Sequence, residues 1–352
     1  MKWISLCHVG GEQAVVKELQ CIKNPSTEIF SGSVAFTATP EEIKTFLIST
    51  QASTRLLRYV SVSKDITGIN FDELHAQIDS QETFCVRADM VVGSFEELGS
   101  QEIASEIGEQ IKRTVSLSQP DKTVFCQIGS EVACGIDVFG DLSKRYYRVF
   151  TNSRSMKGTL AATILHTVPL QGVLLDPFGN TGEIAIEAAL LSSDISPIKY
   201  QLHQPCVGIP HLEEATKTTG SQIEQIRCFD GSLAHIRSAE KNAKLAGVQE
   251  HISFSKTPID WLDVKFSEGV VDAIVTVPPP VTNRNTEENH LQELFHQAPF
   301  VLKKGGFLVV GCSTPQTSAA VLRISHEQGL RVGGEVVVYS GKAAHHIIYY
   351  EL

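Results

Sequence analysis

The sequence predicts an α/β protein whose C-terminal half is a doubly wound parallel sheet, preceded by a smaller α+β region. From residue 156 onward, short apolar runs alternate with helical segments, which is the pattern of parallel strands joined by crossover helices. Before residue 150, short strand-like runs mix with amphipathic helices and show no such repeat. The length of 352 residues suits two domains or three small ones.

The N-terminal part contains both kinds of element. A helical stretch covers residues 9–19, residues 33–36 are strand-like, and residues 58–62 form another strand. Between these strands, Pro40 and the two acids after it start a second helix, since Pro and acidic side chains suit a first helical turn. This order predicts a small α+β sandwich.

A second small unit follows. Its elements are a strand at 83–88, a helix at 100–113 and paired strands at 123–128 and 134–138. In the helix, isoleucines recur at four-residue intervals, which places them on one face. Polar residues at 148–153 mark the linker that ends this unit.

The C-terminal half repeats strand–helix units. The expected strands are 173–175, 226–229, 273–276 and 307–310, and the expected helices are 184–191, 232–246 and 288–302. Continuous apolar runs are typical of strands buried on both faces. Gly247 ends the second of these helices, as glycine commonly does.

Composition excludes several classes of protein. The hydrophobic fraction is 42%, which suits packed cores, and no apolar run reaches the ~18–20 residues that span a bilayer. The first residues lack a long apolar stretch and a cleavage site, so we expect no secretion signal and a cytoplasmic protein. A membrane span, a fibrous rod and a secreted disulfide scaffold are therefore not expected.

Eight cysteines are present without any Cys-x-x-Cys pair or zinc-like spacing. We expect reduced, mostly buried thiols and no metal site. His345 and His346 are adjacent, and neighbours in a strand point to opposite faces. We interpret them as one surface and one core histidine.

The charge limits how nucleic acid could bind. There are 30 Lys and Arg against 40 Asp and Glu, a net charge of −10, so any contact with nucleic acid must come from a local patch. One basic stretch interleaved with aromatics contains Lys144, Arg145, Arg148, Arg154 and Lys157. The alternative is a solvated strand and linker whose aromatics pack inward.

Ligands of doubly wound sheets bind at the carboxyl ends of the strands. After the first strand, residues 176–183 read Asp-Pro-Phe-Gly-Asn-Thr-Gly-Glu, and two glycines allow a tight turn and a close approach of a ligand. The third glycine of a dinucleotide site is missing, and Glu183 would repel a pyrophosphate. An uncharged or zwitterionic nucleoside fits better than NAD. A plain strand–helix turn is the alternative.

The other strand ends also carry candidate groups. Asp230, before Gly231, could accept hydrogen bonds from ribose hydroxyls or could cap the next helix. Asp260 and Trp261 offer an acceptor and a flat ring suited to adenine, although a lone Trp is more often part of a core. Residues 278–280 are three prolines, which cannot extend a ladder and present carbonyls on a rigid segment or form a structural turn.

Together these features resemble the S-adenosylmethionine-dependent RNA methyltransferases that carry a THUMP module, and most closely the tRNA guanine-N2 methyltransferases. The family's Asp-Pro-Phe-Cys-Gly-Ser-Gly motif is similar to residues 176–182, and its Ile-Glu-Ala-Ala to residues 186–189. Further similar segments are Lys157 before Thr-Leu-Ala-Ala at 159–162, Asp230 with Lys-Asn-Ala at 241–243, and residues 135–137 and 142–148.

The resemblance implies three domains: a ferredoxin-like α+β domain at 1–65, a THUMP RNA-binding domain at 66–152 and a Rossmann-like methyltransferase domain at 153–352. It implies S-adenosylmethionine as cofactor and tRNA as partner, with the basic patch helping to grip the acceptor end. Asp176, Phe178, Gly179 and Gly182 would shape the pocket for the cofactor's amino-acid end. Asp230 and Gly231 would hold the ribose, and Asp260 with Trp261 the adenine.

One motif departs from the family. The catalytic Asn- or Asp-Pro-Pro-Tyr or -Phe is matched here by residues 277–280, Val-Pro-Pro-Pro. Valine cannot accept a hydrogen bond from the target amine, and loss of one such contact typically costs ~10²–10³ in rate. Pro280 offers little surface to a base. Thr276, Pro278 and Pro279 remain as catalytic candidates, helped by Thr282 or Asn283.

Three functions follow for comparison. The first is methyl transfer from S-adenosylmethionine to guanine N2 of tRNA by in-line displacement. The second is a tRNA-binding pseudoenzyme beside an active protein partner, which the valine motivates. The third is a dinucleotide-dependent oxidoreductase, which the missing third glycine disfavours. The tRNA position, the number of methyl groups and the oligomeric state do not follow from the sequence.

Overall fold

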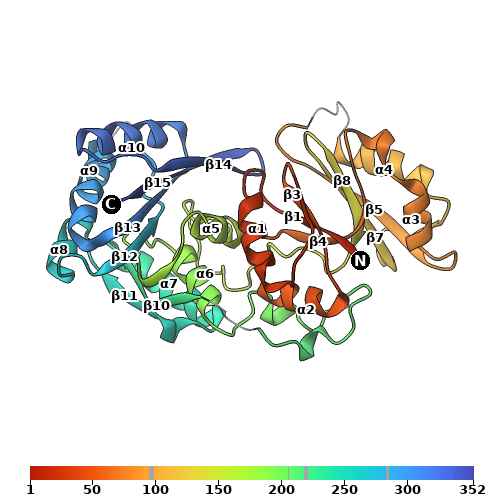
Figure 1. Cartoon of the computed structure of the whole chain (residues 1–352), viewed down its shortest axis with the longest axis horizontal. Helices are drawn as coiled ribbons and strands as arrows, with labels where there is room; N and C mark the ends of the chain where they lie inside the picture. The colour runs from red at the N-terminus through yellow and green to blue at the C-terminus, as the bar shows by residue number, and fades with distance from the viewer. Residues whose placement is uncertain (95–98, 205, 218–220, 283–284) are drawn as a thin grey trace. The chain divides into compact units, whose positions relative to one another are not determined.

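A computed structural model describes residues 1–94, 99–204, 206–217, 221–282 and 285–352. Its contacts divide the chain into two units, residues 1–143 with 201–215 and residues 144–200 with 216–352 (Figure 1). Each unit contains one sheet with helices on it, which confirms the predicted α/β class.

Within the described residues, the first unit forms an eight-stranded sheet in the order β2-β3-β1-β4-β8-β7-β5-β6. Its strands are β1 (Lys2–Leu6), β2 (Thr27–Phe30), β3 (Ser33–Thr37), β4 (Arg55–Ser63), β5 (Thr83–Met90), β6 (Thr114–Val115), β7 (Lys122–Ile128) and β8 (Val132–Asp137). Its helices are α1 (Glu12–Glu18), α2 (Pro40–Ser49), α3 (Phe71–Gln77) and α4 (Ser100–Gln110). The helix predicted from Pro40 is confirmed, and a reciprocal pair of Thr39 and Glu42 hydrogen bonds caps it.

The sheet runs across the predicted boundary at residue 65. Strand β4 of the first predicted domain pairs with β8 of the second, and Tyr59 lies opposite Gly135. A Cβ on Gly135 would collide with the Arg58 carbonyl oxygen, so glycine permits this close approach. Residues 201–215, predicted in the last domain, return to this unit, where the Val207 amide donates to the Val138 carbonyl over 2.8 Å.

The described part of the second unit forms a seven-stranded sheet in the order β11-β10-β9-β12-β13-β15-β14. The strands are β9 (Gln171–Asp176), β10 (Gln222–Asp230), β11 (Ile252–Lys256), β12 (Val271–Thr276), β13 (Leu302–Cys312), β14 (Gly334–Ser340) and β15 (Ala343–Glu351). The first five are parallel, and all of them except β11 were predicted, while β15 runs antiparallel between β13 and β14. A short turn joins β14 to β15, and such a turn can connect only antiparallel strands.

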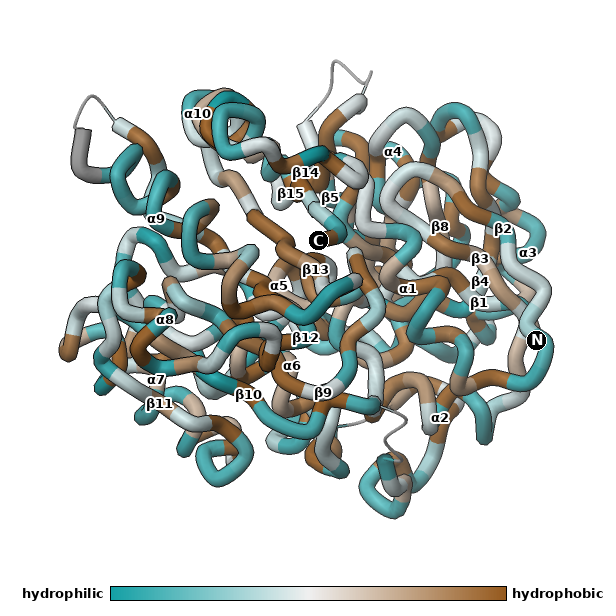
Figure 2. The backbone as a smooth tube through the Cα atoms, turned by 60° about the vertical axis from the view of Figure 1, so that its left-hand side comes forward, coloured by the Kyte–Doolittle hydropathy of each residue, from teal (hydrophilic) through white to brown (hydrophobic). Residues whose placement is uncertain are grey.

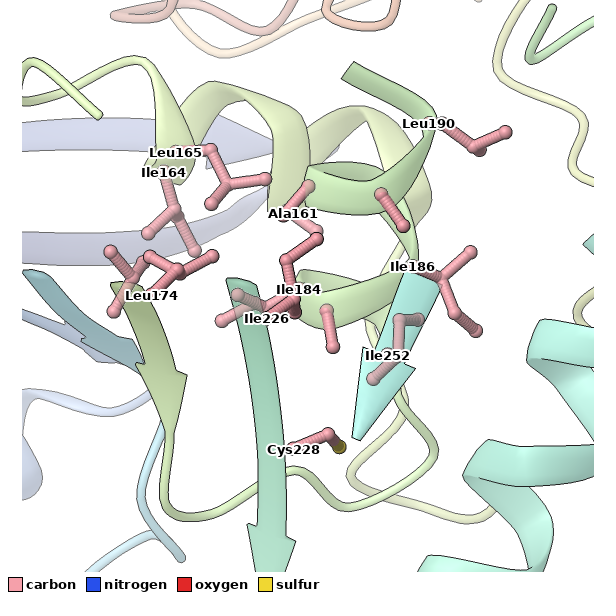
Figure 3. Close-up of a cluster of buried hydrophobic side chains, with 14 of the residues drawn as sticks. Ala161, Ile164, Leu165, Leu174, Ile184, Ile186, Leu190, Ile226, Cys228 and Ile252 are labelled. Carbon is pink, nitrogen blue, oxygen red and sulfur yellow. The ribbon is translucent and has the colours of Figure 1, made fainter. Parts of the chain in front are cut away.

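Helices cover both faces of this sheet. They are α5 (Gly158–Leu165), α6 (Glu183–Ser192) and α7 (Leu233–Ala246) on one face, and α8 (Leu262–Lys265), α9 (Asn285–Val301) and α10 (Pro315–Glu327) on the other. Figure 3 shows α5 and α6 side chains packed with apolar residues of β9, β10 and β11. Figure 2 shows hydrophilic and hydrophobic residues alternating along α9 and α10.

This packing fixes the place of the ligand-binding edge. Strands β10, β9 and β12 are neighbours, and their carboxyl ends carry Asp230, Asp176 and Thr276. The residues that follow each strand therefore meet at one edge of the sheet. Among the described residues, no helix has both the length and the hydropathy needed to cross a membrane.

Gly182, which precedes α6, offers a direct test of this packing. Its φ is +91°, and a Cβ there would lie 2.9 Å from the Ala239 Cβ on α7. We expect Gly182→Ala to lower the free energy of unfolding by about 2–4 kcal/mol, because backbone strain and a steric clash add.

Gly329→Ala is the matched control. Gly329 has a φ of +80° with nothing within 4 Å of the added Cβ, so it carries the strain alone. Urea unfolding of both variants should show the larger loss for Gly182→Ala. Equal losses would contradict the close packing of α6 on α7.

Candidate functional site

The loop after β9 is held tightly against β10. The Gly179 amide donates to the Phe229 carbonyl over 2.7 Å, and a Cβ at Gly179 would collide with the Cys228 sulfur. Asn180 adopts a φ of +46°, which asparagine tolerates better than most residues. Gly179 and Gly182 are thus required by packing and by backbone conformation, and in this way they shape the loop.

Asp176 is the buried centre of this region. Its carboxyl accepts a hydrogen bond from the Thr276 hydroxyl over 2.6 Å and one from the Phe178 amide over 3.2 Å. Burial raises the pKa of Asp176 to about 7, and the nearby acids Asp230 and Glu183 contribute to that shift, against the lowering effect of these hydrogen bonds. A carboxyl with this pKa is present in both its protonated and its ionised form near neutral pH.

Asp230 is held by three partners. Its carboxylate accepts from the Asn180 amide over 3.0 Å and from the Ser232 amide over 2.8 Å, and it lies 3.0 Å from the His235 ring nitrogen Nδ1. It binds the amide at the start of α7, as the capping interpretation expects, and it also lines a cavity. A carboxylate has about four acceptor positions, so one remains for a ligand.

A polar network fixes the segment before α5 to the same loop. The side-chain Nδ2 of Asn152 donates to the side-chain Oδ1 of Asn180 over 2.7 Å, and the Ser155 and Thr181 hydroxyls lie 2.6 Å apart. Asn242 of α7 belongs to the Lys-Asn-Ala segment at 241–243, and its side-chain Nδ2 donates to the Thr181 carbonyl over 2.9 Å. The loops after β9 and before α5 therefore form one structure.

A first cavity of about 330 Å³ opens beside this loop. Its acidic side contains Asp176 and Glu183, and burial raises the pKa of Glu183. Val277, Pro278 and Pro280 line another side.

A second cavity of about 600 Å³ also borders the proline segment, residues 277–280. Pro279 faces it, and so do Asp230, Gly231 and the exposed Asp260. Phe178 and Arg154 line both cavities. A ligand longer than one cavity could therefore contact both sides of the same loop.

Arg154, which was predicted to contact RNA, lines both cavities. It is half-buried in the cavity walls rather than on an open surface. Burial lowers the pKa of its guanidinium, while the negative charges of Asp230 and Asp176 oppose that change. Arg154 therefore places a cationic group in the wall that the two cavities share. Lys144 and Lys157 are exposed, and Arg148 is half-buried 3.9 Å from Glu183.

Arg145 is fully enclosed, so the prediction that it contacts RNA was wrong. Its side chain is 0% exposed and its guanidinium binds both carboxylate oxygens of Glu187, over 2.7 Å and 3.2 Å. Tyr147 donates to the same carboxylate over 2.8 Å. A guanidinium enclosed in this way cannot reach a phosphate in solution, because separating a buried ion pair leaves an uncompensated charge.

Two other predicted site residues, Thr276 and Trp261, do not line either cavity. Thr276 is fully buried and its hydroxyl donates to Asp176, so it positions that carboxyl and does not face a substrate. Trp261 is 52% exposed and is absent from the walls of both cavities. Thr282 is exposed, and Asn283 lies outside the described residues.

One wall of the first cavity was not predicted from the sequence. Ser313 follows β13, Ser340 ends β14, and His345 lies on β15; all three line this cavity. The alternation of neighbouring strand residues correctly separates His345 from His346, which contacts Glu335 over 2.5 Å. The interpretation of the pair as one surface and one core histidine was wrong, because both are half-buried. No group of three or more His, Cys, Asp or Glu that could hold a metal ion is found among the described residues.

Residues 145–340 match the family described as UPF0020, RMKL-like methyltransferase domain. A ribosomal RNA large subunit methyltransferase K/L of Syntrophotalea carbinolica is 28% identical over 202 residues, 52% of this chain and 28% of that protein. A tRNA (guanine(6)-N2)-methyltransferase of Methanocaldococcus jannaschii is 31% identical over 184 residues, 49% of this chain and 48% of that protein. The matched region spans less than half the length of either relative.

The fold is also found among solved structures. The crystal structure of a possible methylase from Clostridium difficile 630 is similar with a TM-score of 0.73 and 19% identity, over 99% of this chain and 97% of that chain. At this identity the likeness concerns the fold alone, and it extends over both units.

The buried Arg145–Glu187 pair yields a stability prediction. We expect Glu187→Gln to destabilise the protein by about 3–5 kcal/mol, because the Arg145 charge stays buried without a full counter-charge. Arg323→Gln, which breaks exposed ion pairs with Glu288 and Glu327, should cost at most about 1 kcal/mol. Urea unfolding measures both, and similar small losses would place Arg145 in solvent.

Asp176 yields a pH dependence. Its folded pKa of about 7 exceeds the unfolded value of about 3.9, so the native state holds more protons between these pH values. Its contribution to stability is thus fully present below about pH 4 and is lost as the pH rises through about 7. Asp176→Asn should flatten this fall, measured as melting temperature against pH. The exposed Asp263→Asn should follow the wild type, and parallel curves for all three proteins would contradict the assignment.

Proposed function

Because the chain belongs to the RMKL-like methyltransferase domain family, we propose that it transfers a methyl group from S-adenosylmethionine to a base in RNA. The observation that carries this proposal is the pair of cavities around the loop after β9 and the proline segment, with acidic side chains from two neighbouring strands. The family and this geometry together support the cofactor.

The residues around the cavities suit the charges of that cofactor. S-adenosylmethionine supplies a methyl group on a positively charged sulfur, and it also carries an amino group and a carboxylate. Asp176 and Glu183 give the first cavity acidic groups that attract cationic ones, whereas Arg154 offers a cation for the carboxylate. Asp230 and Asp260 line the second cavity, where acceptors suit ribose hydroxyls and an adenine amino group.

The residues around the cavities contribute to cofactor binding in different ways. Asp230 accepts a hydrogen bond from a ribose hydroxyl while its other acceptor positions keep the loop closed through Asn180. Phe178, which lines both cavities, provides an apolar surface where they meet. Gly179 and Gly182 hold the loop backbone close to β10 and α7, which leaves the cavity open.

The target we favour is guanine N2 of tRNA. One relative is named for that reaction, at 31% identity over about half of this chain, and the motifs described above resemble the same family. We propose that residues 66–152 contain the THUMP-like RNA-binding region, of which residues 66–143 belong to the first unit. Lys144, Arg148 and Lys157 are the remaining members of the basic patch that could contact phosphates.

The proline segment limits the catalytic groups. Val277 lines the first cavity where the family carries Asn or Asp, and it has no acceptor to offer. Thr276 cannot replace that acceptor because its hydroxyl is committed to Asp176. Pro278 lines the same cavity, so its carbonyl can accept from an exocyclic amine, and Pro279 stiffens the segment. Catalysis would rest largely on positioning.

The missing catalytic groups in the proline segment also favour a second candidate function. A protein that lacks the acceptor at Val277 and the aromatic ring at Pro280 could bind RNA and the cofactor without turnover. It would then serve as an RNA-binding partner of an active enzyme. Single-turnover incubation with labelled cofactor and unmodified tRNA separates the two candidates.

The experiment combines calorimetry with methyl transfer. We expect the wild type to bind S-adenosylmethionine and to label tRNA, and Asp230→Ala to weaken binding at least tenfold, because a charge-assisted hydrogen bond contributes about 1.5–3 kcal/mol.

Glu250→Ala serves as the control, since it removes one exposed acid outside both cavities. Equal affinities for all three proteins would reject the cofactor site. Binding without any methylated tRNA would favour the second candidate.

A further inference from the structure

The first cavity has two chemically different sides. Asp176, Glu183 and the loop after β9 form the acidic side, which the proposed function assigns to the cofactor. The other side is built by the ends of β13, β14 and β15 and carries the hydroxyls of Ser313 and Ser340 and the imidazole of His345. Between the two lie Val277, Pro278 and Pro280 of the proline segment.

The β14–β15 hairpin directs His345 into this cavity. His345 pairs in register with Val338 of β14, and the next residue, His346, pairs with Cys312 of β13 and contacts Glu335. Because successive strand residues alternate in direction, only the first of the two histidines can face the cavity. The short turn from Ser340 to Ala343 holds this edge of the wall, and both of those residues also line it.

His345 is suited to accept a proton. Partial burial, together with the nearby His346, lowers its pKa, so its imidazole is neutral at physiological pH. A neutral imidazole has one ring nitrogen free of hydrogen, and that nitrogen is a general base. The charged groups around this cavity are Arg154 and Lys157 from the segment before α5, Asp176 of β9 and Glu183 of α6.

Methylation of an exocyclic amine releases a proton, which such a base can accept. The amine nitrogen forms a bond to the methyl carbon, and the carbon–sulfur bond breaks with its electron pair going to sulfur, which becomes a neutral thioether. The nitrogen is then positively charged and must release one proton. Val277 cannot assist this release, and Thr276 is buried beneath Asp176.

We propose that the wall of Ser313, Ser340 and His345 receives the target purine and that His345 is the catalytic residue that takes the proton from its exocyclic amine. The inference rests on the proposed function and names its base. The proton passes from the amine nitrogen to the free ring nitrogen of His345 and then to solvent, which restores the neutral imidazole. The two hydroxyls offer donors and acceptors to the edge of the purine.

The test compares His345→Gln with the matched control His346→Gln. With tRNA and S-adenosylmethionine, His345→Gln should lower kcat about 10²–10⁴-fold with little change in KM, because proton transfer and not binding is lost. The acid limb of the wild-type pH–kcat profile should lose the part that reports protonation of His345, which leaves the titration of Asp176. His346→Gln should retain kcat and shift that limb slightly to higher pH, since one repelling neighbour is gone.

A second readout does not depend on turnover. Diethyl pyrocarbonate modifies neutral imidazoles, and guanosine at saturating concentration should protect His345, but not His346, as measured by peptide mass spectrometry. A variant His345→Gln with wild-type kcat and pH profile would overturn the inference, and so would modification of His345 that guanosine leaves unchanged. If the wild type transfers no methyl group, the proposed function fails, and the protection result alone decides whether this wall binds a purine.

Discussion

The site depends on the hydrogen bond between the Thr276 hydroxyl and the buried Asp176 carboxyl. It joins the carboxyl ends of β12 and β9, so the proline segment and the loop after β9 are held at a fixed separation. The Phe178 amide binds the same carboxyl, and the Asn180 amide continues the connection to Asp230 on β10. Three neighbouring strand ends are thus tied together around the two cavities, and burial of Asp176 keeps this connection away from competing water.

The sequence predicted the parallel strands and crossover helices of the second unit well, because continuous apolar runs and helical periodicity report burial directly. It failed where pairing depends on distant residues. The single sheet of the first unit requires β4 to pair with β8, and the antiparallel β15 lies between β13 and β14; neither pairing leaves a local signal. Strand register of this kind is set by tertiary contacts.

The candidate site, like the fold, was predicted only in part from the sequence. The positions of Asp176 and Asp230 followed from strand ends, which a doubly wound fold brings to one edge. The surroundings of single side chains did not follow. Arg145 and Arg154 belong to the same basic stretch, yet one is enclosed with Glu187 and the other lines the cavities. Charge patterns cannot distinguish these cases, because burial depends on the packing of α6 and on the loop before α5. His345 was recognised as a strand residue, but its place in the cavity wall was not predicted, since the β14–β15 hairpin was not predicted.

The central claim is that the linked strand ends enclose a cofactor site, and hydrogen–deuterium exchange with added S-adenosylhomocysteine tests it most directly. The account predicts slower amide exchange in peptides covering residues 176–183 and 229–232, with no change in the strands β7 and β8 of the other unit. Unchanged exchange in both peptides at saturating ligand, or slowing confined to the first unit, would contradict it.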